Sequence, residues 1–433
     1  EDYDQSSNLT HNYNYFYEEL QKQVVPIDDL YAAIGKLEVI CITLDPGDDA
    51  QLIFESLNST GLALDEGDKI RYYILMGQSL PMQTHLYEKY WLPIENCTEG
   101  DVSAFVRDYL SIKQQMTPTI KAVYRDFKAF AESLDSDVEA LLKDMLDYAR
   151  LYKKLLTCES ALDDCLYRMK RLEITVTRPF LMEVLRLCRE GKLNAKDVLK
   201  VFLIVETYLF RRNICEVPTN GLNKIFLSLN REVLRYDGTT ERYVDKLSYA
   251  LQSKRDSGRF PDDEAFAAAL ASKQVYLMRG RYKEYMFERF ENFGTVEVKD
   301  VYTLLDNGTY SIEHIMPQHL TPRWTRELGS DYAQIHATWQ HRLANLTLTG
   351  YNPHLSNATF IEKRDAPEGG YRSSGLRMNQ HIAQLERWTL PELEARSEAM
   401  VKYARDKIWA YPKTDYVPAK RELETCTLGD EDY

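Results

Sequence analysis

Ser311-Ile-Glu-His-Ile-Met-Pro-Gln318 is a short β-prone run that places an acid and a histidine side by side. Further along, Leu343-Ala-Asn-Leu-Thr-Leu-Thr-Gly-Tyr-Asn-Pro-His-Leu-Ser-Asn357 contains a second β-prone run, residues 345–349, and then an Asn/Pro break. That break should start a helix over residues 355–364. The order strand, long loop, strand, helix therefore brings Glu-His at the end of one strand toward asparagines of the next strand and helix.

This layout is that of a ββα-metal (HNH-type) nuclease, and the chemistry of such a site explains the residue types. Cutting a phosphodiester needs a water that loses its proton and a cation that neutralises charge on phosphorus and the leaving oxygen. His314 suits the general base, because an imidazole titrates near neutral pH. Glu313 and a helix asparagine are candidate oxygen ligands for magnesium or manganese. Asn345 is placed to hold the loop and orient the His314 ring. A lone Glu-His pair, by contrast, is most often a surface pair.

The joint pattern "EHIMPQ" and "W…HRLANLTLTGYN..LSN..F..KR" resembles, over residues 275–412, the HNH nuclease domain of GmrSD-type modification-dependent restriction endonucleases. The resemblance implies His314 as general base, Glu313 as its metal-binding neighbour and Asn345 as the middle asparagine. For the third element of the motif, the order of preference is Asn352, Asn357 and His354. Lys363 is a candidate phosphate contact, and a solvated lysine is an equal alternative.

A second stretch, "IFESLNSTGLALDEGDKIRYYIL", is similar to part of the N-terminal ParB-like NTPase and sensor domain of the same proteins. Phosphorothioate-sensing SspE-like proteins are similar too. The resemblance implies a GTP or ATP site formed by Phe54, Asn58, Asp68 and Arg71. From spacing alone, residues 58–61 form a turn and Asp65 caps a helix through residue 76. The family's earlier Asp-Gly-Gln-Gln-Arg string does not occur, so we expect the first half of that domain to be missing and do not expect this chain alone to hydrolyse nucleotide.

Composition and charge restrict the possible classes of protein. A chain of 433 residues can form two or three domains. No run of 18 apolar residues occurs, which predicts no membrane span. The 7 cysteines are scattered without Cys-x-x-Cys, which is typical of a reduced, cytoplasmic protein without structural zinc. The net charge of −13 argues against indiscriminate nucleic-acid binding, although residues 311–413 are slightly basic.

Apolar spacing predicts a mainly α, multidomain protein. We expect the second half of the sensor domain, with partial α/β character, at 1–78; a helical connector at 79–270; the nuclease, embedded in helices, at 271–413; and an acidic tail at 414–433. In the connector, Arg211 and Arg212 are more consistent with a structural role than with a DNA contact. Further phosphate candidates are Arg372 and Arg377, with a basic cluster at Arg279, Arg281 and Lys283.

The leading hypothesis is an endonuclease of anti-phage defence that cuts modified DNA with one divalent metal and a histidine base. An NTP-dependent sensor would regulate it, and it could act as a homodimer. The alternative is a non-catalytic DNA- or protein-binding component of a defence complex. A third option is a nucleotide-binding regulator that uses the stretch from Phe54 to Arg71 alone.

Overall fold

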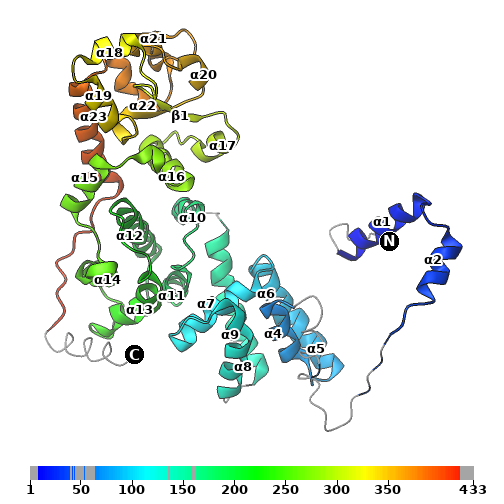
Figure 1. Ribbon diagram of the computed structural model, residues 1–433. Coiled ribbons are helices and arrows are strands. Elements are labelled where there is room, and N and C mark those ends of the chain that lie inside the picture. The colour runs from blue at the N-terminus through cyan, green and yellow to red at the C-terminus, as the bar shows by residue number, and fades with distance from the viewer. Residues whose placement is uncertain are drawn as a thin grey trace. The chain divides into compact units, whose positions relative to one another are not determined.

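The computed structural model describes residues 8–39, 41, 43, 53, 64–134, 137–157 and 161–419, without the side chains of residues 8, 161–163, 353 and 354 (Figure 1). The chain divides into two compact units, residues 1–63 and 64–433. The first unit contains α1 (Asn8–Gln21) and α2 (Ile27–Ile34). Residues 36–39, 41 and 43 of this unit are not part of a strand. Predicted α/β character is therefore not seen in the described residues of this unit.

The second unit begins with a helical part. Its helices are α4 (Glu66–Leu75), α5 (Leu80–Leu86), η1 (Tyr87–Trp91), α6 (Leu92–Cys97), α7 (Val102–Gln114), η2 (Ile120–Ala122), α8 (Val123–Ser133), α9 (Val138–Leu156), α10 (Ala161–Arg171), α11 (Arg178–Arg189), α12 (Ala195–Ile214), α13 (Leu222–Arg235), α14 (Tyr243–Ser253) and η3 (Asp256–Gly258). Capping side chains fix the first residue of several of these helices. The Asp65 side chain accepts a hydrogen bond from the Asp68 backbone N–H, which confirms it as the cap of α4.

The C-terminal part surrounds a two-stranded sheet. Its elements are α15 (Asp263–Ser272), η4 (Val275–Leu277), α16 (Gly280–Asn292), α17 (Val301–Asp306), β1 (Ser311–His314), α18 (Pro322–Leu328), α19 (Tyr332–Trp339), η5 (Leu343–Asn345), β2 (Leu346–Thr349), α20 (Asn352–Leu355), α21 (Phe360–Asp365), η6 (Tyr371–Ser373), α22 (Arg377–Gln380), η7 (Ile382–Gln384), α23 (Leu390–Tyr403) and η8 (Ala404–Ile408). In Figure 1, α18 to α22 gather around the sheet at one end of this unit.

The predicted single helix at residues 355–364 is wrong in its bounds. The chain forms α20 and α21 instead, separated by Ser356, whose φ of 36° is not helical. Thr359 and Glu362 then build a capping box that starts α21. The Asn/Pro break therefore starts the short helix α20. The capping box of Thr359 then starts α21 separately.

Three hydrophobic clusters lie in the second unit, and two of them cross the predicted domain boundaries. Ile70 and Ile74 of α4 belong to the core of the helical part, so α4 lies in that core and not in a separate domain ending at residue 78. Phe210 of α12 stacks on Trp409 with ring centroids 4.1 Å apart, within a cluster that also contains α15 and α16. One of the three clusters is therefore built from residues of both the helical and the C-terminal parts.

The chain end returns to the helical part. After η8, the segment runs back along α14, with Tyr416 against Tyr236 and the Gln252 amide donating to the Pro412 carbonyl. Residues 414–419 of the predicted tail are thus packed, and residues 420–433 lie outside the described part.

Candidate active site

The two strands place Glu313 and His314 on opposite faces of the sheet. Strand β1 pairs antiparallel with β2, with Glu313 opposite Thr347 and His314 opposite Leu346. Successive side chains of a strand point to opposite sides, so the acid and the imidazole enter different surroundings. Both are nearly buried, with exposed fractions of 3% and 5%.

The His314 ring lies against a second histidine. Its Nε2 atom is 3.2 Å from the Nδ1 atom of His341, which follows α19. Tyr276 of η4 holds this histidine pair: its ring stacks on His341 and meets His314 edge to face, with centroids 5.5 and 4.3 Å apart. The Tyr276 backbone N–H also donates to the His341 carbonyl at 3.1 Å. Three segments far apart in the sequence therefore fix the orientation of the His314 ring.

The surroundings keep the histidine pair neutral at pH 7. Burial, followed by the nearby His341, lowers the pKa of His314 to about 3. Burial also lowers the pKa of His341. Lys283 adds positive charge beside the pair, where its Nζ donates to the Tyr276 carbonyl at 2.8 Å. A neutral imidazole has one nitrogen free to accept a proton, which a general base requires.

Glu313 is paired with Lys363 on the other face of β1. The Lys363 Nζ lies 2.5 Å from the Glu313 Oε1 and 2.7 Å from the His314 carbonyl, and the lysine is fully buried. Burial raises the pKa of Glu313 despite the opposing charge of Lys363, and lowers that of Lys363 despite Glu313. Neither alternative for Lys363, a phosphate contact or a solvated lysine, matches this position, because the ammonium is committed to Glu313.

Asn345 holds the loop that follows β1. Its Oδ1 accepts from the backbone N–H of Met316 at 2.8 Å and from Trp388 Nε1 at 3.1 Å. Its Nδ2 donates to the carbonyls of Met316 and Gln340. The side-chain amide of Asn345 therefore bonds to the loop, to Gln340 and to Trp388. The residue that contacts the His314 ring is His341.

The candidates for the third motif element occupy different positions. The Asn352 Nδ2 donates to the Ile312 carbonyl at 3.4 Å, which ties α20 to β1. Asn357 is exposed, and the His354 side chain lies outside the described residues. In the part of the chain that the structure describes, no three His, Cys, Asp or Glu side chains gather to hold a metal ion. Because Glu313 binds Lys363, its carboxylate is not free to hold a divalent metal in this arrangement.

Of the predicted phosphate contacts, Arg372 is the exposed one, and its guanidinium pairs with Asp365 and Glu386. Arg377 is committed internally, to the Phe293 carbonyl and the Tyr403 hydroxyl. The buried Arg211 pairs with Asp263 at 2.6 Å, which agrees with the structural role preferred for it. Arg212 is buried as well and donates to neutral oxygens. The two phosphate candidates, Arg372 and Arg377, therefore lie in local ion pairs or packing contacts.

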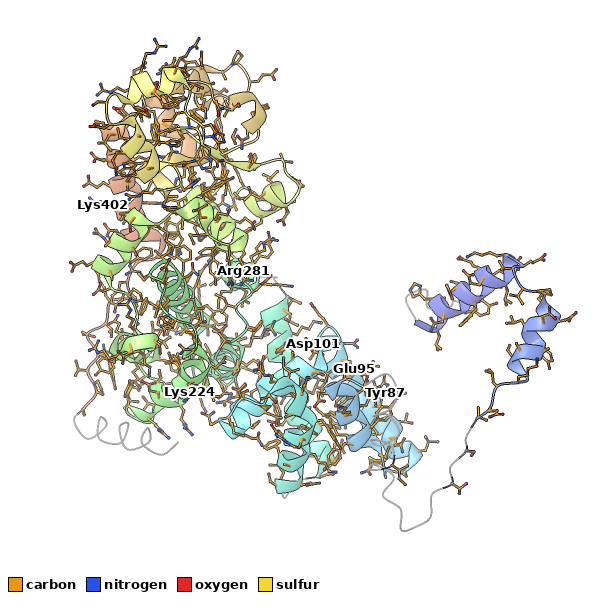
Figure 2. The ribbon with its side chains drawn as sticks, viewed as in Figure 1. Tyr87, Glu95, Asp101, Lys224, Arg281 and Lys402 are labelled. Atoms are coloured by element: carbon orange, nitrogen blue, oxygen red, sulfur yellow. The ribbon has the colours of Figure 1, made fainter. Side chains whose placement is uncertain are left out.

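Of the four nucleotide candidates, the structure describes Asp68 and Arg71. Asp68 and Arg71 pair within α4 at 2.7 Å, and Arg71 also reaches Glu95, labelled in Figure 2, at 2.9 Å. Phe54 and Asn58 lie outside the described residues. The ion pair joins α4 to α6, which is a packing role.

Two residues beside the histidine pair were missed by the sequence reasoning. His341 stands in the quoted string "HRLAN", four residues before Asn345, and this proximity was the available signal. Arg342, the next residue, lies over the Trp339 ring at 4.9 Å and has no acidic partner among the described side chains.

Among the described residues, no helix has the length and apolar character needed to cross a bilayer. The family model described as "GmrSD restriction endonucleases, C-terminal domain" matches residues 260–403. The search of curated proteins gave no match. The family match does not reach residues 1–259, so the ParB-like sensor and the likeness to SspE-like proteins stay predictions. Residues 260–403 thus support a restriction endonuclease of the GmrSD type, that is, a nuclease with DNA as its partner.

Proposed function

We propose that this chain is a DNA endonuclease in which His314 is the general base and His341 its orienting partner. The contact between His314 Nε2 and His341 Nδ1, at the end of β1 inside the matched region, carries the proposal. With a proton on Nε2 donated to His341, the His314 Nδ1 atom has a free lone pair. No other proton assignment leaves His314 both oriented by His341 and able to accept a proton.

The reaction follows from this arrangement. His314 Nδ1 takes a proton from water, the resulting hydroxide attacks phosphorus, and the bond from phosphorus to the leaving oxygen breaks. The His314 imidazolium that forms keeps its Nε2 hydrogen bond to His341. Lys283 is a nearby cation that would attract the phosphate.

The substrate class, the biological setting and the cofactors are also part of the proposal. The substrate is modified DNA, the setting is defence against phage, and Mg²⁺ or Mn²⁺ and an NTP are the predicted cofactors. These rest on the family resemblance. The competing possibility is a non-catalytic binding component of a defence complex, and cleavage itself distinguishes the two.

A plasmid nicking assay tests the proposal with modified and unmodified DNA, each with and without manganese and nucleotide. The chain should convert supercoiled plasmid to nicked or linear DNA, and His314→Ala should not. His85→Ala is the matched control, because His85 is partly exposed and bonds Glu139 in the helical part. Equal cutting by a folded His314→Ala variant, or none by the parent under every condition, would contradict the proposal. Cleavage that needs manganese would show that the ion-pair arrangement around Glu313 changes when metal binds.

A further inference from the structure

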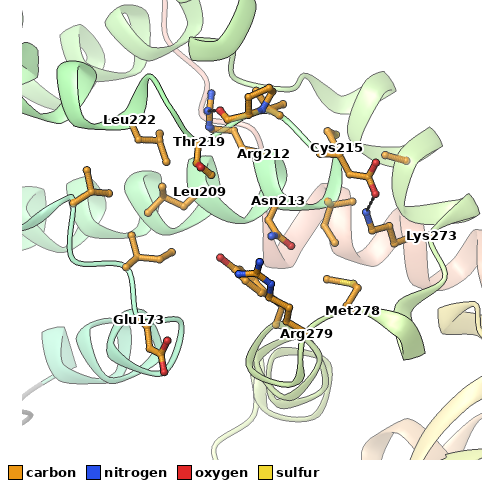
Figure 3. Close-up of a pocket in the computed structure, with 18 of the residues that line it drawn as sticks. Glu173, Leu209, Arg212, Asn213, Cys215, Thr219, Leu222, Lys273, Met278 and Arg279 are labelled. Carbon is orange, nitrogen blue, oxygen red and sulfur yellow. Dashed lines mark hydrogen bonds and ion pairs between the residues drawn. The ribbon is translucent and has the colours of Figure 1, made fainter.

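A large open pocket lies where the helical part meets the C-terminal part. It has a volume of about 1220 Å³ and is lined from one side by the end of α12 and from the other by residues 272–282. Figure 3 shows Asn213 and Arg279 extending toward each other from these two walls. We call it the junction pocket. Its volume exceeds the range of about 300–1,000 Å³ that is usual for small-molecule sites, so it has room for a ligand as large as a mononucleotide.

The charges on its walls do not balance. Both acidic side chains that line it are already paired, Glu216 with Lys273 at 2.5 Å and Glu173 with Arg281. Arg279 has no acidic partner among the described residues. The Arg279 guanidinium is therefore a positive charge at the pocket surface that no described carboxylate pairs with.

Arg212 supplies a second cation without a counter-charge. It is 2% exposed, and its guanidinium donates to the Tyr208 hydroxyl and to the carbonyls of Arg259 and Pro218, which are all neutral. Its Nε atom has no hydrogen-bond partner. Buried charges are normally paired, so an anion in the adjoining pocket would be favoured.

We propose that the junction pocket binds a small phosphate-bearing ligand, with Arg279 and Asn213 as direct contacts and Arg212 as a charge behind them. Apolar side chains at the pocket wall, including Leu209, Leu222 and Met278, would cover the uncharged part of the ligand. The phosphate can belong to a free small molecule or to the end of a nucleic-acid strand.

The same pocket wall reaches the histidine pair. Gln274, Met278 and Arg279 line the pocket, while Tyr276 between them binds the His341 backbone and stacks on its ring. A ligand held by Arg279 would restrain this short segment and with it the orientation of His341. The coupling between the bound ligand and His341 rests on the proposed function of the histidine pair. Binding of the ligand in the junction pocket does not.

Calorimetric titration of the full chain tests binding with three probes: inorganic pyrophosphate, AMP and a 5′-phosphorylated single-stranded tetranucleotide. At least one should bind, Arg279→Gln should weaken it at least tenfold, and Arg279→Lys should restore part of the loss. Arg125→Gln, at an exposed arginine of α8 outside the pocket, should bind like the parent. Which probe binds best identifies the source of the phosphate. No binding of any probe up to millimolar concentration, or equal binding by Arg279→Gln, would overturn the site.

Amide hydrogen exchange tests the coupling without using nuclease activity. Pyrophosphate should slow exchange in a peptide covering residues 274–283, and Arg279→Gln should abolish the effect. Binding with unchanged exchange would overturn the coupling and leave the pocket assignment in place. Failure of the nicking assay would leave both measurements unaffected, so the two proposals can fail separately.

Discussion

The Nε2 atom of His314 lies 3.2 Å from the Nδ1 atom of His341, although the two residues are 27 positions apart in the sequence. The contact joins the end of β1 to the segment after α19, and Tyr276 packs against both rings. A second imidazole thus occupies the position beside the proposed base that sequence reasoning gave to the Asn345 amide.

Replacing His341 with alanine should slow DNA cleavage about tenfold or more, while His314→Ala should slow it by about 100-fold or more, as expected for loss of a general base. The reason for the smaller effect is that His341 orients the base and does not itself take the proton from water. Initial nicking rates measured from pH 4 to pH 8 test this, because loss of His341 should raise the pKa of His314 from about 3 and shift the acidic limb of the profile upward. If His341 only supports the fold, the variant will lose activity in proportion to its folded fraction and keep the parental pH profile.

Replacing Lys363 with methionine should reduce the free energy of unfolding by about 3–5 kcal/mol, because it leaves the Glu313 carboxylate buried without its counter-charge. Adding Glu313→Gln should recover part of the loss. Urea denaturation of the two single variants and the double variant gives the coupling energy.

The exposed pair Arg323–Glu362 is the matched control for this measurement, since its side chains are 65% and 50% exposed. Arg323→Met should change stability by no more than about 0.5 kcal/mol. Strictly additive effects of Glu313→Gln and Lys363→Met would contradict the ion-pair assignment.

Asn345→Ala should destabilise the protein by about 2–4 kcal/mol, because it removes hydrogen bonds to both backbone groups of Met316 in a buried site. Asn357→Ala, at an exposed asparagine of the same region, should leave stability nearly unchanged. Thermal and urea unfolding of both variants measure the difference. Similar stability of the two would show that the loop after β1 is held by other contacts.

Asp108→Asn should stabilise the protein at pH 8 and have little effect at pH 4. Burial raises the pKa of Asp108 to about 7, above its ordinary value near 3.8. The folded state therefore favours the protonated acid, so the stability contribution is full below about pH 3.8 and is lost as pH rises toward 7. The contribution of Asp108 to the free energy of unfolding differs by up to about 4 kcal/mol between the low-pH and high-pH limits.

Melting temperatures of the parent and of Asp108→Asn, measured between pH 4 and pH 8, test whether the stability gain of the variant grows as the pH rises. Asp331→Asn, at an exposed position, serves as the control and should show no such trend. A stability gain that is the same at pH 4 and pH 8 would be inconsistent with titration of Asp108.

Local sequence signals anticipated several parts of the fold. Asp65 caps α4 as expected, and the β-prone runs became β1 and β2. The same signals misplaced the helix after β2, since a capping box at Thr359 starts α21 separately.

The sequence by itself determined the helical content, the helix caps and the two strands, because periodicity and capping depend on residues within a few positions of one another. Only the tertiary structure decided which groups meet. Glu313 and Lys363 are 50 positions apart, and His314 meets His341 across a long loop. Such contacts depend on how β1, α19 and α21 pack, and on the desolvation that then favours a partner for each buried charge.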